Sequence, residues 1–366
     1  MPIAAAMSAH AYDITRSYDW NYAHAPARVP DVRVPACAGD WKFCGIPVAS
    51  PLGIPAGPLL NSRWILYYAA LGFDVLTYKT VRSSARASYS PPNLVPVRHA
   101  SIAGEGSTVV MADSVAEESW AISFGMPSKD PDVWQEDVEA ARRELPEGKV
   151  LVVSVVASPQ DQWTLGRIAA DFARCARLAR DAGAHAIEAN LSCPNVATQE
   201  GNLYASPEAS REIAAAVRDA APALPIVLKV GLFNDADHAE AVVRAVTGYA
   251  DAISTTNTIT AVVRRPDGTA IFDGQRRGIG GRVIGARCLA ELVMLRDVID
   301  RAGSNVRLVS VGGVSSAADV RERLAMGADH VQLATAAMLN PMVGIAIRKA
   351  LSRSAAEHAG HATTRS

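Results

Sequence analysis

Residues 187–196 read IEANLSCPNV and combine an apolar beginning with a strongly polar end. Residues 186–191 have the length and composition of a buried strand. The polar end carries Asn190, Cys193 and Asn195. Ligand sites of parallel α/β folds lie at the carboxyl ends of their strands. A thiolate can act as a general base, and an asparagine amide both donates and accepts hydrogen bonds. The stretch therefore predicts a functional site, the alternative being that the cysteine is a small buried apolar residue.

Seven further segments have the character of buried strands, and helix-like segments separate them. They are residues 51–57, 74–81, 149–158, 225–232, 251–259, 306–314 and 330–338. The valine-rich continuity of 149–158 is typical of a strand that is buried on both faces. Strict alternation of strand and helix predicts a parallel sheet, and eight such units favour an α/β fold of the closed (β/α)8 TIM-barrel type. No GxGxxG follows a strand, which disfavours a Rossmann domain.

The barrel is expected to cover residues 49–351, after an N-terminal extension over residues 1–48. A polar tail over residues 352–366 is expected to be disordered. Residues 82–148 hold little alternation for their length, so an insertion with some β character is predicted between the second and third strands. Residues 260–281 form a second excursion, which is polar and carries glycine and arginine.

Composition narrows the class of protein. Of 366 residues, 49% are hydrophobic and 20% are charged, with a formal net charge of −1. These values indicate a globular protein with a large core and argue against a nucleic-acid partner. The five cysteines form no CxxC pair and the histidines share no metal-ligand spacing, so no disulfide framework, iron–sulfur cluster or metal site is predicted. With no signal peptide and no apolar span, we expect a cytoplasmic protein without a membrane span.

Polar residues and glycines mark the predicted carboxyl ends of the strands and should face one ligand. They are Ala56, Gly57, Lys79, Thr80, Ser154, Asn190–Asn195, Lys229, Thr256, Asn257, Gly280, Gly281, Gly312, Gly313, Ala334 and Thr335. Both lysines lie inside apolar strands, where an ammonium is costly without a partner. Either each lysine reaches water at the rim, or it meets a negatively charged group of a ligand.

A Gly-Gly turn followed by two serines, VGGVSS, suggests a phosphate site. Ser315 and Ser316 are possible N-caps of a helix, whose first backbone N–H groups would then point at an anion. TIM barrels commonly bind phosphate at the loops after their seventh and eighth strands. The position of the turn in the strand order is what raises this interpretation above that of a simple tight turn.

Eight motifs together resemble the dihydroorotate dehydrogenase family, which is FMN-dependent, over about residues 46–350. They are PLGIPAG, the lysine of TYKT, NLSCPN, VLKVG, TTNTI, GIGG, VSVGGV and QLAT, in the order of the family. The cysteine of NLSCPN resembles that of the class 1 enzymes and of the pyrimidine-reducing domain of dihydropyrimidine dehydrogenase. Residues 195–207 look more like the longer loop of the heteromeric class than like the short loop of the homodimeric class.

The resemblance implies FMN in the mouth of the barrel. It assigns Cys193 as the catalytic base and Asn190, Asn195 and Asn257 as amides that bind the substrate. Lys79 would contact the flavin together with Asn190 and Lys229, and Gly312, Gly313 and Thr335 would lie near its phosphate. The implied cofactor-binding residues are Ala56, Gly57, Lys79, Thr80, Asn190, Lys229, Thr256, Gly280, Gly281, Gly312, Gly313, Ala334 and Thr335.

The implied reaction is the oxidation of dihydroorotate to orotate in pyrimidine biosynthesis. Cys193 takes a proton from the carbon next to the substrate carbonyl, while a hydride passes from the adjacent carbon to flavin N5. Fumarate, a quinone or a partner subunit would receive the electrons, and a homodimer or a hetero-assembly is implied.

One stretch departs from the family pattern of N-x-M-G-x-x-N. Ile122 and Ser128 stand where the family has asparagines that contact the substrate. A different dihydropyrimidine-like or secondary-metabolite substrate is therefore the alternative. A third interpretation is a barrel without catalysis that acts as a binding partner, because a fold alone does not establish a function.

Overall fold

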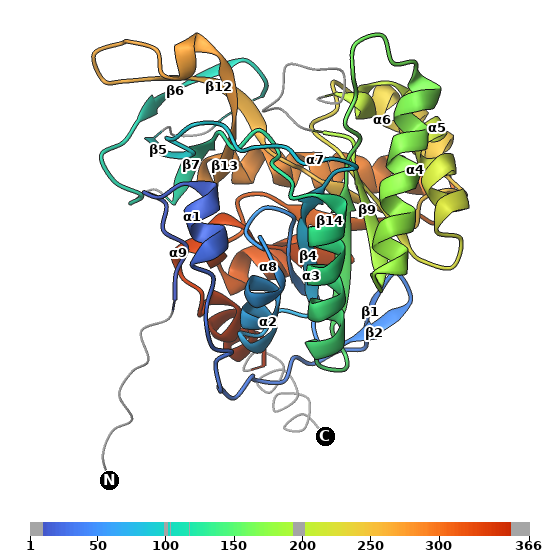
Figure 1. Cartoon of the computed structure of the whole chain (residues 1–366), viewed down its shortest axis with the longest axis horizontal. Helices are drawn as coiled ribbons and strands as arrows, with labels where there is room; N and C mark the ends of the chain where they lie inside the picture. Colours follow the sequence, from blue (N-terminus) through green and yellow to red (C-terminus); the bar gives the residue numbers. More distant parts are fainter. Residues whose placement is uncertain (1–9, 99–101, 103, 117, 193–201, 353–366) are drawn as a thin grey trace, which may run out of the picture.

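A closed barrel of eight parallel strands forms the centre of the computed structural model, which describes residues 10–98, 102, 104–116, 118–192 and 202–352 (Figure 1). In chain order its strands are β3 (Leu52–Ile54), β4 (Val75–Val81), β8 (Val150–Val155), β9 (Ala186–Asn190), β10 (Ile226–Lys229), β11 (Ala252–Thr255), β14 (Arg307–Val311) and β15 (His330–Gln332). β15 pairs with β3 and closes the ring. The predicted TIM barrel is confirmed, and every strand lies inside the segment predicted for it.

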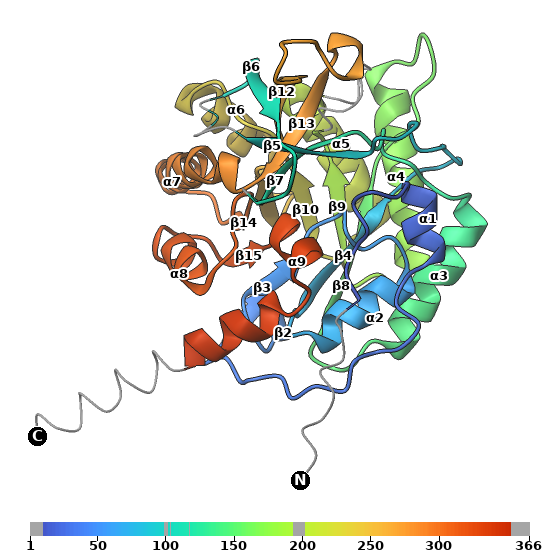
Figure 2. The same cartoon turned by 90° about the vertical axis from the view of Figure 1, so that its left-hand side faces the viewer.

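Helices surround this barrel (Figure 2). They are α2 (Ser62–Ala70), α3 (Pro131–Glu144), α4 (Leu165–Asp181), α5 (Pro207–Ala220), α6 (Ala236–Val246), α7 (Gly285–Arg301), α8 (Ala317–Ala325) and a last helix over residues 343–352. Polar N-caps begin several of them: the side chains of Thr164, Ser206 and Asp235 each accept a hydrogen bond from a backbone N–H three residues on. Among the described residues, no helix combines the length and apolarity needed to cross a membrane.

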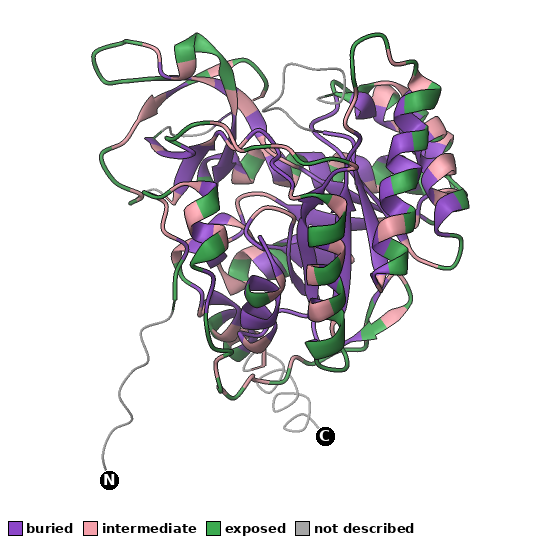
Figure 3. Cartoon of the chain, in the orientation of Figure 1, coloured by how far each residue is buried: buried purple, intermediate pink, exposed green. Residues whose placement is uncertain are grey.

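The strands of the barrel are buried (Figure 3), and their two faces pack into different cores. Side chains that face the helices belong to one large cluster, for example Leu76, Leu151, Ile187, Leu228 and Ile253. Side chains that point into the barrel form a second cluster, for example Val75, Val150, Ala186, Val227 and Ala252. Because both faces are buried, the strands read as continuous apolar runs and not as alternating ones.

A hairpin of the N-terminal segment covers one end of the barrel. Its strands are β1 (Trp41–Phe43) and β2 (Ile46–Val48), which pair antiparallel. Phe43 and Val48 belong to the interior cluster of the barrel, and the Phe43 ring lies 5.2 Å from the ring of His330. The hairpin therefore leaves only the opposite end of the barrel, where the strands finish, for a ligand.

Two insertions combine into a second, smaller closed barrel of five strands. These are β5 (Leu94–Arg98), β6 (Ser107–Met111) and β7 (Ser119–Ile122) from the first insertion, and β12 (Ile259–Arg264) and β13 (Arg276–Gly281) from the second. β12 pairs with β6, and β13 pairs with β7. The β character expected for the first insertion is present, but its pairing with residues 260–281 was not predicted.

Three α-helices differ from the sequence-based expectation, in addition to the strands of the hairpin and of the second insertion. The strand expected over residues 330–338 ends at Gln332, and Thr335–Leu339 form the short helix α9, because an alanine-rich run suits a helix as well as a strand. The helix α1 (Tyr18–Ala23) was not predicted in the N-terminal extension. The crossover helix α3 was also missed, because only three of its side chains are buried.

The carboxylate of Asp74 connects four separate segments at the amino end of β4. It accepts hydrogen bonds from Ser50 Oγ and Lys149 Nζ, both at 2.5 Å, and from the guanidinium of Arg348. Asp74 and Arg348 are both almost completely buried. The first two strands, the third strand and the last helix are thus tied together by one charged group.

We expect Asp74→Asn to lower the free energy of unfolding by about 3–5 kcal/mol, because it leaves buried cations without their counter-charge. Urea unfolding followed by circular dichroism measures the change. Asp300→Asn is the matched control, since Asp300 pairs with Arg296 on the surface and should cost less than about 1 kcal/mol. Equal losses in the two variants would contradict the role given to Asp74.

Candidate active site

A cavity lies between the carboxyl ends of the eight-stranded barrel and the five-stranded barrel. Its empty volume is about 1100 Å³, part of which is open to solvent. The residues that line it are Pro55, Ala56, Gly57, Pro58, Lys79, Thr80, Leu94, Glu118, Trp120, Ile122, Phe124, Met126, Asn190, Lys229, Asn257, Thr258, Gly280, Gly281, Arg282, Ile284, Val311, Gly312, Gly313, Val314, Ser315, Gln332, Ala334, Thr335, Ala336 and Met338.

Polar side chains of the large barrel form the floor of the cavity. Lys79, Asn190 and Lys229 project from the ends of β4, β9 and β10, and all three are buried. Asn190 and Lys229 are direct partners in the sheet register. The amide of Asn190 lies 3.4 Å from Thr80 Oγ1, to which it donates, and Thr80 is hydrogen-bonded to Ser154. Two ammonium groups and an amide thus meet where a ligand would enter.

Asn257 and Asn190 fix the chain just before position 193. The Asn257 amide donates to the carbonyl oxygen of Ser192, and Ser192 N–H donates to Asn190 Oδ1 at 3.2 Å. Ser192 is therefore held by two residues that line the cavity, both of them predicted ligand amides. Cys193 and Asn195 themselves lie outside the described residues.

A chain of close backbone contacts forms the wall at the glycine pairs. Gly281 and Gly313 have φ of +100° and +76°, which favours glycine. A Cβ atom at Gly281 would lie 2.1 Å from the carbonyl oxygen of Glu118, and one at Gly313 would lie 2.1 Å from the Cα of Gly285. A side chain at either position would overlap neighbouring backbone, so this part of the cavity wall consists of main-chain atoms.

The buried guanidinium of Arg323 lies behind this wall. It donates to the carbonyl oxygens of Gly285, at 2.7 Å, and Gly312, at 3.2 Å. Burial lowers its pKa, but an arginine keeps its charge at neutral pH. This cation adds positive potential beneath the glycine loop, and no sequence motif had pointed to it.

The helix end that was expected to meet an anion is already satisfied. The backbone N–H groups of Ser315 and Ser316 both donate to Asp319 Oδ2 at 2.9 Å, and Ser316 Oγ accepts from Asp319 N–H in a capping box. The prediction that Ser316 caps a helix is confirmed. The amides of these two serines, however, are occupied by Asp319.

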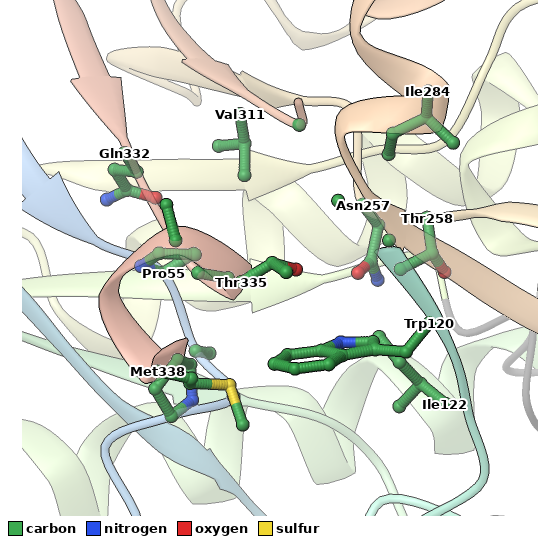
Figure 4. A pocket seen from close by; sticks show the side chains of 18 of the residues that line it. Pro55, Trp120, Ile122, Asn257, Thr258, Ile284, Val311, Gln332, Thr335 and Met338 are labelled. Atoms are coloured by element: carbon green, nitrogen blue, oxygen red, sulfur yellow. The ribbon is translucent and has the colours of Figure 1, made fainter. Parts of the chain in front are cut away.

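Apolar side chains from the small barrel form the roof (Figure 4). The indole of Trp120 extends from β7 across the cavity toward Met338 of α9, and Ile122 lies beside it. In the sheet register Trp120 pairs with Gly280 and Ile122 pairs with Gly278. The ligand space therefore has a polar floor and a largely apolar roof.

Ile122 and Ser128, the two departures noted in the sequence, have different surroundings. Ile122 lines the cavity, whereas Ser128 is not among its lining residues. The hydroxyl of Ser128 accepts from Arg82 N–H at 3.1 Å and donates to the carbonyl oxygen of Lys129. Only the change at Ile122 therefore alters the chemistry of the lining.

The structure brings almost all described candidate residues to this cavity. Those that line it are Ala56, Gly57, Lys79, Thr80, Asn190, Lys229, Asn257, Gly280, Gly281, Gly312, Gly313, Ala334 and Thr335. Thr256 and Ser154 are not among the lining residues. Thr256 is fully buried and its hydroxyl is hydrogen-bonded to Thr255, and the hydroxyl of Ser154 is hydrogen-bonded to Thr80. Sequence reasoning missed Trp120, Thr258 and Met338. Residues of these types indicate a ligand site only when their position in the fold is known.

The sequence model of the family described as "Dihydroorotate dehydrogenase" matches residues 40–354. The dihydroorotate dehydrogenase of Dictyostelium discoideum is 30% identical over 357 residues, which cover 91% of this chain and 95% of that protein. The dihydroorotate dehydrogenase (quinone) of Clavibacter sepedonicus is 26% identical, covering 84% of this chain and 83% of that protein.

A solved structure shares the fold. The crystal structure of DHODH from Eimeria tenella in complex with ferulenol superimposes with a TM-score of 0.73 at 16% sequence identity, covering 91% of this chain and 88% of that one. At this identity the likeness concerns the fold alone.

We expect Gly313→Ala to destabilise the protein more than Gly248→Ala. Both glycines have positive φ, but Gly248 has open space where its Cβ would lie. The control should lose about 1–2 kcal/mol from its backbone conformation. Gly313→Ala should lose at least about 2 kcal/mol more, because Gly285 must move. Urea unfolding measures both, and equal losses would contradict the close backbone approach.

Proposed function

The chain belongs to the dihydroorotate dehydrogenase family, and on that premise we propose that it oxidises dihydroorotate to orotate in pyrimidine biosynthesis with FMN as cofactor. The observation that carries the proposal is the convergence of Lys79, Asn190 and Lys229 at the floor of one cavity. This arrangement combines positive charge, an amide and an enclosed space at the ends of parallel strands.

The residues of the cavity fit FMN. Gly281, Gly312 and Gly313 leave backbone free of side chains, with the Arg323 guanidinium behind them, and this suits a phosphate. The enclosed floor with its two lysines suits a flavin ring. Bound FMN would supply the acceptor of the hydride. Lys79 and Lys229 would stabilise negative charge on the ring by their position beside it.

We propose Cys193 as the base that removes the proton next to the substrate carbonyl. The electron pair of that C–H bond forms the new C=C bond as a hydride leaves the adjacent carbon. Support comes from the resemblance of NLSCPN and from Ser192, which Asn190 and Asn257 hold at the cavity edge. Asn190, Asn195 and Asn257 would bind the alternating N–H and C=O groups of the pyrimidine.

The apolar roof supports a second candidate, in which the same chemistry acts on a dihydropyrimidine without a carboxylate. Ile122, Phe124 and Met126 present no side chain that hydrogen-bonds strongly to an anion. A carboxylate held against these residues would lose hydration without a full replacement, whereas an uncharged substituent would not.

Anaerobic addition of dihydroorotate to the FMN-loaded protein tests the proposal. We expect the flavin absorption to bleach, and Cys193→Ala or Cys193→Ser to slow bleaching by at least about 100-fold, the scale of general-base catalysis. Bleaching by dihydrouracil and not by dihydroorotate would select the second candidate. A protein that binds no FMN would refute both. Reoxidation by fumarate or by a quinone then identifies the electron acceptor.

Alkylation of the thiols gives an independent check on Cys193. Burial raises the pKa of Cys175 to about 12 and that of Cys288 to about 11, so both stay protonated and unreactive at pH 8. Iodoacetamide should therefore label Cys193 faster than either, and dihydroorotate should slow that labelling. Peptide mass spectrometry measures the rates. Faster labelling of Cys175 or Cys288 in the folded protein would contradict the assignment.

A further inference from the structure

One layer inside the eight-stranded barrel is made entirely of polar side chains. In a barrel of this type, alternate strands contribute four side chains to each interior layer. Thr77, Glu188, Ser254 and Gln332 come from the alternate strands β4, β9, β11 and β15, on the faces that point inward. Gln332 Nε2 donates to Thr77 Oγ1 at 3.4 Å across the interior, which shows that the layer is in contact.

Three members of this layer carry buried oxygen atoms for which no described residue provides a hydrogen bond. They are Glu188 Oε1, Ser254 Oγ and Gln332 Oε1. Glu188 is 1% exposed, and Ser154 and Val227 are its register partners on either side. A carboxylate buried in this way is costly unless a cation or several donors compensate it.

Lys229 supplies the complementary group in the next layer. It follows Val227 by two residues on β10, so its side chain also points inward, one step closer to the cavity. Lys229 is 2% exposed, and no ion pair or hydrogen bond joins its ammonium to another residue of the described part of the chain. The three unsatisfied oxygen atoms of the layer below and the three N–H donors of the ammonium above are therefore matched in number and in kind.

We propose that Glu188 is a positioning residue that holds Lys229 at the cavity floor through ordered water bound in the layer of Thr77, Ser254 and Gln332. No direct contact joins the two charges, and buried water typically makes about three hydrogen bonds to such unsatisfied groups. The pair cancels charge beneath the cavity and fixes the direction of the ammonium. Its effect on a bound flavin rests on the proposed function, whereas the pairing itself does not.

The other ionisable groups that face the interior lie farther from Glu188. Lys79 follows Thr77 by two residues on β4 and lies at the rim of the barrel. His330 precedes Gln332 by two residues on β15 and lies on the opposite side of the layer. Burial lowers the pKa of His330, which keeps its ring neutral at pH 7. Lys229 is accordingly the cation that lies one layer from the carboxylate.

A double-mutant cycle tests the pair in the full-length protein. Glu188→Gln should lower the urea midpoint of the otherwise wild-type chain, because it leaves the Lys229 ammonium without a counter-charge. In the Lys229→Met background the same substitution should leave the midpoint unchanged or raise it. Equal losses in both backgrounds would overturn the proposal, since Glu188 would then act through its own hydrogen bonds. If a single variant does not fold, rescue by the second substitution supports the pair, and failure of the double variant overturns it.

The midpoint potential of bound FMN provides a second readout, which a purely structural role would not change. Glu188→Gln should raise the potential, because loss of a negative charge near the ring favours its reduction. Glu291→Gln is the control: Glu291 is equally buried, but it binds Phe233 N–H and Arg287 on the outer side of the barrel. An unchanged potential in Glu188→Gln would overturn the proposal. A protein that binds no FMN would refute the proposed function and leave the stability cycle to decide on the pair.

Discussion

Closure of eight parallel strands brings all of their carboxyl ends to one rim, and the rest of the structure depends on this constraint. A parallel strand is buried on both faces, so its backbone ends are the places where polar side chains meet without disturbing a core. The hairpin of β1 and β2 fills the opposite end with Phe43 and Val48. Lys79, Asn190 and Lys229, far apart in the sequence, are consequently directed into one cavity.

The sequence was sufficient to predict this barrel because its signals are local. A run such as residues 149–158 is apolar and continuous, and the helices between strands begin at recognisable caps such as Thr164. The same locality explains why the strand-end residues could be assigned to one face. Thr256 shows where such an assignment fails. A shift of one residue at a strand end decides whether a side chain faces the ligand space or is buried beneath it, and the hydroxyl of Thr256 is buried against Thr255.

The small barrel could not be predicted in the same way. Its ladders join residues about 150 positions apart, as in the pairing of Arg264 with Val110. Neither insertion has enough apolar residues for a core of its own, so neither shows a clear strand pattern alone. Trp120 and Ile122 can be recognised as cavity residues only once the pairing of β13 with β7 is known, because this pairing directs their side chains toward the cavity. The roof of this site, which the insertions build, therefore could not be predicted from local sequence patterns. Its floor, which the strand ends build, could.

Roof and floor are nevertheless joined by backbone contacts at Glu118 and Gly281. The carbonyl oxygen of Glu118, just before β7, accepts from Arg282 N–H at 3.1 Å and leaves no room for a side chain at Gly281. Gly285, at the start of α7, touches Gly313 in turn. The position of β7, and so of Trp120, is thus set by backbone contacts that lead directly to the glycine loop. Side chains of the roof can vary without disturbing these contacts, because the contacts involve only main-chain atoms. This separation allows the barrel to keep the backbone of the glycine loop while the apolar roof sets the shape and polarity of the cavity beneath it.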